Sequence, residues 1–228
     1  MKKIYSLVVA LFATMALSAQ TYDFSTMNFT QDDITVVNGE ITDNAEKSYF
    51  EVKNNEGETV EMTFQQVPNV VFSYKNSAVK TAFKVYYGEG NGKVQLDGNQ
   101  RDITFNNITP GTDITLTVAS KGSTAAQFVE SSKGTPFTGC VHKEGDVELA
   151  PKGDETIFTD LTVTAIASTV IIRETSGGYV LTKIVIGNET GLNNATVESA
   201  KAQKVIENGV LYILKNGVKY NVLGAVVK

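Results

Sequence analysis

The chain has 228 residues, of which 42% are hydrophobic and 9% aromatic, with one cysteine and no tryptophan. Residues 20–190 carry 13 Lys or Arg and 23 Asp or Glu, a net charge of about −10. A body this acidic repels phosphate backbones, which argues against nucleic acid as a partner. The single Cys140 excludes an intrachain disulfide, so a hydrophobic core must supply the stability.

Residues 1–19 have the pattern of a secretory signal peptide. A basic start (MKK) is followed by an apolar run over residues 4–17 and by small residues before Gln20. The apolar run is shorter than the roughly 20 residues that cross a bilayer, and no cysteine stands at the cleavage point to anchor a lipid. We therefore expect a secreted or outer-surface protein without a membrane span once the signal is removed. The alternative is an N-terminal core helix.

Residues 20–187 predict a β-sandwich or jelly-roll domain. Hydrophobic residues recur at every second position, with Thr or charged residues between them, as in Val60/Met62/Phe64, Ile114/Leu116/Val118 and Leu161/Val163/Ala165. Turn-forming groups such as Thr109-Pro110-Gly111 and Ser176-Gly177-Gly178 separate these runs at spacings typical of short antiparallel strands. The pattern indicates an all-β fold without alternating helices.

The sequence predicts that residues 188–203 are a linker and that residues 204–228 form a small β-meander. Asn208-Gly209 and Asn216-Gly217 are dipeptides suited to two-residue hairpin turns, and they stand between β-branched and aromatic runs. Residues 191–228 carry five Lys and two Glu, so this end is basic while the body is acidic. A meander this short buries little apolar surface alone, which favours an appendage to the larger domain.

The tail resembles the C-terminal sorting domain of the type IX secretion system of Gram-negative bacteria, over about residues 191–228. The resemblance rests on the spacing of the two Asn-Gly pairs, the tyrosines of neighbouring strands, the Val-Leu-Gly corner and the basic last residue. It implies that the tail is a sorting signal read by the type IX export machinery, with these residues carrying it: Gly209, Gly217, Tyr220, Gly224 and Lys228. The alternative is a C-terminal hairpin that completes the main sheet.

The body more weakly resembles the carbohydrate-binding-like jelly-roll modules of secreted bacterial proteins. The matching segments are the opening at residues 22–24, the run RDITFNNITPGTDITLTVASKG at residues 101–122, and the closing GGYVLTKIVIG at residues 177–187. In that group the opening aromatic is often Trp, whereas this chain has Tyr22. The resemblance implies a non-catalytic module with polysaccharide as its partner.

The sequence has few residues that are suited to catalysis. His142 is the only histidine, no G-x-S-x-G motif presents a nucleophile, and further Cys or His ligands for zinc are missing. Cys140 and His142 fit an ordinary strand better than a catalytic pair. We predict no enzyme, no catalytic residue and no cofactor. Structural calcium remains open, because Asp97-Gly98-Asn99 and Asp154-Glu155 are oxygen-rich loops.

The candidate ligand-binding residues are Tyr86, Asp97, Asn99 and Arg101. A sugar ring stacks on an aromatic face that has polar groups beside it. Tyr86 falls on the opposite phase of its strand from Phe83 and Val85, which predicts a place outside the core. Tyr74 and Tyr179 are weaker candidates for the same role.

The sequence thus predicts a non-catalytic surface module that binds carbohydrate. Two alternatives stay open: a structural or interaction protein of the cell surface without a small-molecule ligand, and a glycoside-active enzyme with paired carboxylates.

Overall fold

The computed structural model describes residues 19–96, 98, 100–142, 144–145, 147–149 and 157–187, and three further strands between residues 203 and 221. The chain divides into two compact units, Met1–Asn188 and Glu189–Lys228. The described residues form β-strands and three short 3-10 turns, η1 (Phe24–Thr26), η2 (Gln31–Asp33) and η3 (Ala45–Lys47), without an α-helix. Nothing in this described part is a helix long and apolar enough to cross a membrane.

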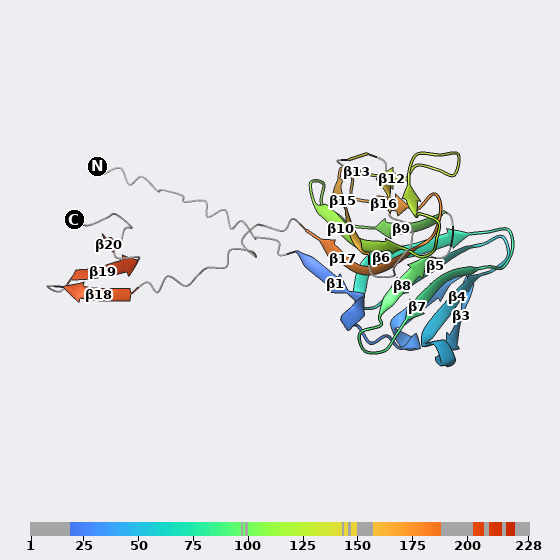
Figure 1. Ribbon diagram of the computed structural model, residues 1–228, viewed down its shortest axis with the longest axis horizontal. Coiled ribbons are helices and arrows are strands. Elements are labelled where there is room, and N and C mark those ends of the chain that lie inside the picture. Colours follow the sequence, from blue (N-terminus) through green and yellow to red (C-terminus); the bar gives the residue numbers. More distant parts are fainter. Residues whose placement is uncertain are drawn as a thin grey trace, which may run out of the picture. The chain divides into compact units, whose positions relative to one another are not determined.

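The first unit contains a nine-stranded antiparallel sheet (Figure 1). Its strands, in order of neighbours, are β13 (Cys140–His142), β15 (Thr159–Ala165), β10 (Asp113–Ser120), β17 (Tyr179–Ile186), β8 (Lys93–Leu96), β7 (Thr81–Tyr86), β4 (Tyr49–Asn54) and β3 (Gly39–Asn44). The ninth strand, β1 (Gln20–Asp23), pairs with the second half of β17.

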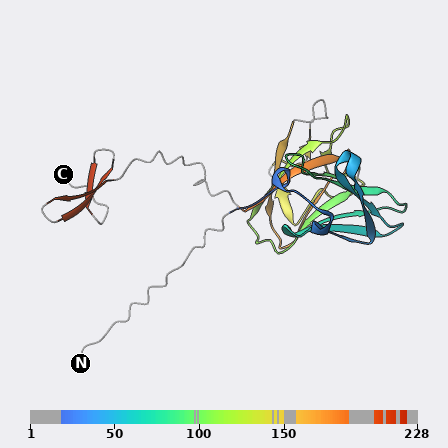
Figure 2. The same cartoon turned by 90° about the horizontal axis from the view of Figure 1, so that it is seen from below.

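A six-stranded antiparallel sheet forms the second layer. Its strands, in order, are β12 (Phe137–Thr138), β16 (Val170–Arg173), β9 (Arg101–Phe105), β6 (Val67–Lys75), β5 (Thr59–Phe64) and β2 (Ile34–Val37). A short pair of strands, β11 (Gln127–Phe128) and β14 (Val147–Glu148), lies outside both sheets. Figure 2 shows the two layers from below.

The two sheets enclose one hydrophobic core. The alternating apolar positions predicted from the sequence are buried, including Met62 of β5, Leu116 of β10 and Val163 of β15, each 0% exposed. Hydrophobic burial of this kind is the main stabilising contribution to folding. The all-β sandwich prediction is confirmed, and the chain repeatedly crosses from one sheet to the other, as in jelly rolls.

Several of these crossings meet at one end of the sandwich. The segments 55–58, 76–80 and 174–178, and the one that contains Gly98 and Gln100, each connect a strand of one sheet to a strand of the other. The Gln100 amide donates to the Glu174 carbonyl at 2.9 Å, and the Gly57 amide donates to the Asn76 carbonyl at 3.0 Å. These hydrogen bonds hold the crossing segments side by side.

The second unit is a three-stranded antiparallel meander of β18 (Gln203–Glu207), β19 (Val210–Lys215) and β20 (Val218–Asn221). Glu207 pairs with Val210, and Lys215 pairs with Val218. Each connection therefore spans two residues, the length for which Asn-Gly pairs are suited. The predicted small C-terminal meander is confirmed, with β18 beginning at Gln203.

Candidate functional site

The strand register at the crossing end sorts side chains onto two faces of the six-stranded sheet. Tyr74 of β6 pairs with Arg101 of β9, and Ser73 pairs with Asp102, which in turn pairs with Arg173 of β16. Because successive side chains of a strand point to opposite faces, Tyr74 and Arg101 face the core, while Asp102 and Arg173 face outward.

Arg101 ties the two sheets together. Its side chain crosses the sandwich, where Nε donates to the Ala82 carbonyl and Nη2 to the Thr81 carbonyl, both at 3.0 Å. The guanidinium carbon lies 4.0 Å from the centroid of the Tyr74 ring, and the residue is 3% exposed. Arg101 thus forms a rigid floor beneath the loops.

Glu174 and Tyr179 are two buried polar residues near Arg101. Both are 0% exposed, and neither the Glu174 carboxyl oxygens nor the Tyr179 hydroxyl has a hydrogen-bond partner among the described residues. Burial raises the pKa of Glu174 to about 8, against the lowering effect of the Arg101 and Lys133 charges. Burial also raises the pKa of Tyr179 well above its usual value. The Glu174 carboxyl is therefore mostly protonated at neutral pH.

On the outer face, Asp102 fixes Arg173. The two carboxylate oxygens of Asp102 accept from Nε and Nη2 of Arg173, each at 2.6 Å. This bidentate pair raises the pKa of Arg173. Nη1 of Arg173 lies toward Gly134, where an added Cβ would stand 2.6 Å from it.

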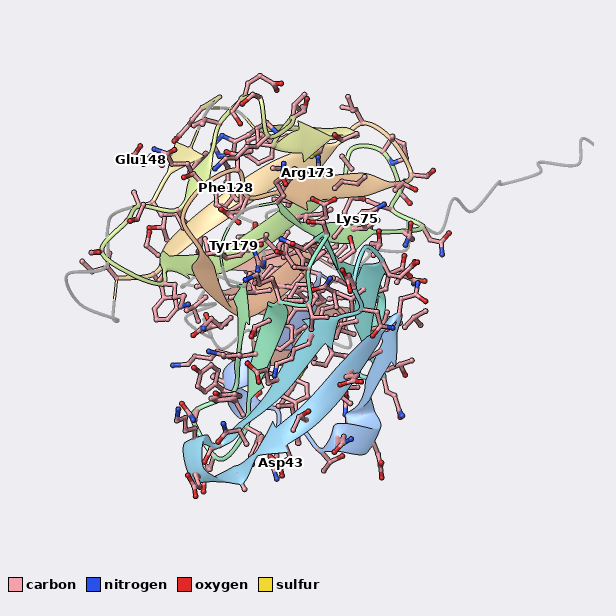
Figure 3. The ribbon with its side chains drawn as sticks, turned by 90° about the vertical axis from the view of Figure 1, so that its right-hand side faces the viewer. Asp43, Lys75, Phe128, Glu148, Arg173 and Tyr179 are labelled. Carbon is pink, nitrogen blue, oxygen red and sulfur yellow. The ribbon has the colours of Figure 1, made fainter. Side chains whose placement is uncertain are left out.

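Two adjoining depressions open at this end, and we call their joint lining the loop-end surface. The first has a volume of about 300 Å³ and the second about 460 Å³. Tyr74 and Gln100 line both. The other lining residues are Thr59, Ser73, Lys75, Asp102 and Arg173 for the first, and Asn76, Lys80, Thr81, Gly98 and Arg101 for the second. Lys75 and Arg173 can be followed as sticks in Figure 3.

Gln100 stands at the junction of the two depressions in a left-handed conformation, with φ of 63°. Its side-chain amide donates to the Lys133 carbonyl at 3.1 Å. Positive φ is uncommon for residues other than glycine and gathers at functional sites, where the surrounding structure enforces it. The neighbouring Asn76 amide donates to the Tyr74 hydroxyl at 2.6 Å. The side-chain amides of Gln100 and Asn76 are thus each held by a hydrogen bond.

The structure does not bring together Tyr86 and Arg101, the two predicted ligand residues that it describes. Tyr86 lies at the opposite end of β7 from Thr81, the residue that Arg101 contacts. Five residues of extended strand separate these ends by roughly 16 Å. Grouping Arg101 with Tyr86 in one ligand site is therefore wrong, because Arg101 points into the sandwich while Tyr86 points away from it.

Tyr86 sits on the outer face of the nine-stranded sheet, on the opposite side from Phe83 and Val85, as its phase predicts. The Lys93 ammonium lies 4.8 Å from its ring centroid, and the Tyr49 ring lies 5.3 Å away. Tyr86 and Phe158, which is 40% exposed, line a shallow depression of about 60 Å³. A stacking role for Tyr86 stays a prediction.

The remaining predicted residues fall mainly outside the described residues. Asp97 and Asn99 lie outside them, although Gly98 and Gln100 beside them line the second depression. The candidate calcium loop at residues 154–155 also lies outside the described residues. Of the sorting-signal residues, Gly209, Gly217, Gly224 and Lys228 lie outside, whereas Tyr220 belongs to β20 and pairs with Ile213.

Cys140 and His142 are placed as strand residues. Cys140 is 5% exposed, and burial raises the pKa of its thiol to about 11, so the reactive thiolate is disfavoured. The His142 ring stacks on Phe137 at 5.4 Å, and its Nδ1 lies 3.0 Å from the Gly145 carbonyl. Across the described residues, no group of three or more His, Cys, Asp or Glu is placed to hold a metal ion.

No protein-family model matches the chain, and no curated protein matches it. Among solved structures, it is similar to the C-terminal CBM6 of LamC, a marine laminarinase from Zobellia galactanivorans, at 10% identity and a TM-score of 0.32, over 75% of this chain and all of that one. It is also similar to the K2 cleaved adhesin domain of Lys-gingipain, at 14% identity and a TM-score of 0.29, with the same coverage.

A third similarity is to a glycoside hydrolase family 43 arabinoxylan arabinofuranohydrolase from Bacillus subtilis, solved in complex with cellotetraose. It has 8% identity and a TM-score of 0.28, over 66% of this chain and 54% of that one. At such TM-scores none of the three similarities supports a fold or a function for this chain.

Proposed function

We propose that the chain is an exported, non-catalytic β-sandwich module that binds a saccharide at the loop-end surface. The observation that carries this proposal is the pair of adjoining depressions joined at Tyr74 and Gln100. Their volumes fall in the range of about 300 to 1,000 Å³ that small-ligand sites occupy. Hydroxyl, amide and ammonium groups line them, and a saccharide offers hydroxyl donors and acceptors to each of these.

The rigidity of the surface supports the same proposal. Arg173 stands at the end of β16, held by Asp102, and Arg101 joins β9 to β7 by hydrogen bonds. Sites carried on strands and fixed by buried hydrogen bonds lose little side-chain freedom when a ligand binds.

The distribution of carboxylates disfavours the glycosidase alternative. Glycosidases use two carboxylates flanking one bond. Asp102 is the one carboxylate that lines the depressions among the described residues, and both its oxygens accept from Arg173. Glu174, although its pKa is raised, is 0% exposed and lines neither depression.

A glycan array followed by calorimetry tests the binding proposal. Gln100→Ala and Asn76→Ala remove amides from the loop-end surface and should each weaken binding about 3- to 10-fold. The matched control is Tyr86→Ala, on the other end of β7. If Tyr86→Ala abolishes binding while Gln100→Ala leaves it intact, the site is the outer face of the nine-stranded sheet. If the wild type binds no glycan, the binding proposal fails, and a surface-interaction role takes its place.

We further propose export through residues 1–19 and sorting through the C-terminal meander. The order of basic, apolar and small residues at the start supports the first step. The meander's separate compactness supports the second, because a removable signal needs no strand of the main sheets. Deleting residues 204–228 should leave the sandwich folded but retained in the periplasm of a host with type IX secretion. Normal release of the truncated chain would refute the sorting role.

A further inference from the structure

We infer that the loop-end surface selects acidic saccharides, which carry a carboxylate or a sulfate ester. This inference rests on the proposed saccharide binding and adds its chemical class. It starts from the charges of the described lining residues, which are four cations against one anion. The cations are Lys75, Lys80, Arg101 and Arg173, and the anion is Asp102.

Asp102, the one anion among the described lining residues, is already engaged. Asp102 accepts from two nitrogens of Arg173 at 2.6 Å, so it has little capacity left to repel an incoming anion or to neutralise a lysine. The same pair orients the guanidinium and leaves Nη1 outside the bidentate contact.

The two lysines carry the inference. Lys75 lines the first depression and Lys80 the second, and neither ammonium forms an ion pair or a hydrogen bond with another described residue. The two depressions adjoin, because Tyr74 and Gln100 line both. The surface therefore offers one ammonium in each of two adjoining depressions, the arrangement that suits an anionic group on each of two neighbouring sugar units.

The rest of the domain makes this arrangement distinctive. Residues 20–190 have a net charge of about −10, so a positive lining does not follow from composition. An acidic surround repels acidic polymers at other positions and leaves this surface as the favourable one.

Calorimetry with charge-matched saccharides tests the inference. The probes are an oligogalacturonate and its fully methyl-esterified form, a sulfated oligosaccharide and its desulfated form, and polyglutamate as an acidic peptide. We expect the charged member of at least one pair to bind at least about fourfold more tightly than its neutral form, and binding to weaken as salt rises. Whether the carboxylate or the sulfate pair shows this difference identifies the anion.

The variant Lys75→Gln/Lys80→Gln should weaken binding of that charged saccharide about 4- to 25-fold, since each exposed ion pair contributes about two- to fivefold. The control Lys47→Gln/Lys183→Gln removes the same charge from η3 and β17, where neither residue lines a depression, and should change affinity less than twofold. Equal binding of charged and neutral forms overturns the inference but leaves saccharide binding intact. Equal binding of polyglutamate overturns it in favour of an acidic peptide. Binding of no saccharide overturns the proposed function itself.

Discussion

Tyr74 and Arg101 are direct cross-strand partners of β6 and β9, and the Arg101 guanidinium carbon lies 4.0 Å from the Tyr74 ring centroid. The contact is made inside the sandwich, where Arg101 also bonds two carbonyls of the facing sheet. A residue that the sequence suggests as a ligand is therefore first a structural clamp. Tyr74 lines both depressions of the loop-end surface, and Arg101 lines the second.

Replacing Arg101 should weaken the fold more than most surface changes. Arg101→Met keeps the volume but removes two charge-assisted hydrogen bonds and the cation–π contact, and we expect the free energy of unfolding to fall by about 3 kcal/mol. Arg101→Lys keeps the charge without the planar fork and should cost less. Urea denaturation measures both. A loss below 1 kcal/mol for Arg101→Met would show that the clamp is dispensable.

Removing either of two tyrosine hydroxyls at the crossing end of the sandwich should change the free energy of unfolding, in opposite directions for the two. Tyr179→Phe removes a buried hydroxyl without a described partner and should raise the free energy of unfolding by about 1 kcal/mol. Tyr74→Phe removes the acceptor of the Asn76 amide and should lower it by about 1 kcal/mol. Thermal unfolding of both variants checks the contrast. Destabilisation by Tyr179→Phe would mean that its hydroxyl has a partner, such as a buried water.

The sheets could be predicted from the sequence because burial on one face of a strand leaves a period of two. The same alternation accounts for the burial of Arg101, because Arg101 lies on the same face of its strand as Ile103 and Phe105, both 0% exposed. The loop-end surface could not be predicted, because it depends on which strands become neighbours. Arg173 pairs with Asp102 across 71 positions of sequence, and no local pattern marks that pairing.

Substitutions at two glycines measure the cost of backbone strain separately from the cost of close packing. Gly177 and Gly57 both have positive φ, at 99° and 75°. An added Cβ at Gly177 would stand 2.5 Å from the Ala125 carbonyl oxygen, whereas at Gly57 it would meet nothing within 4 Å. Gly57→Ala should cost about 1 kcal/mol for the backbone alone, and Gly177→Ala about 3 kcal/mol, because backbone must also move. Equal losses in chemical denaturation would contradict the close approach of these loops.

Glu174 should make the stability of the domain depend on pH. Its pKa is about 8 in the folded state, against an ordinary value of 4.5, because burial disfavours the carboxylate. The folded state therefore binds a proton that the unfolded state releases between these values. This contribution is fully present below pH 4.5 and is lost as pH rises to 8, by on the order of 4 kcal/mol.

Glu174→Gln removes the carboxyl group that titrates while keeping the shape of the side chain. The free energy of unfolding of the variant, relative to the wild type, should therefore rise steadily from pH 4.5 to pH 8 and then level off. Any constant cost of burying the amide shifts the whole curve without changing this slope. Parallel curves for the two proteins across that range, measured by urea denaturation, would show that the Glu174 carboxyl ionises normally. The residue would then have access to water or to a cation that its 0% exposure does not reveal.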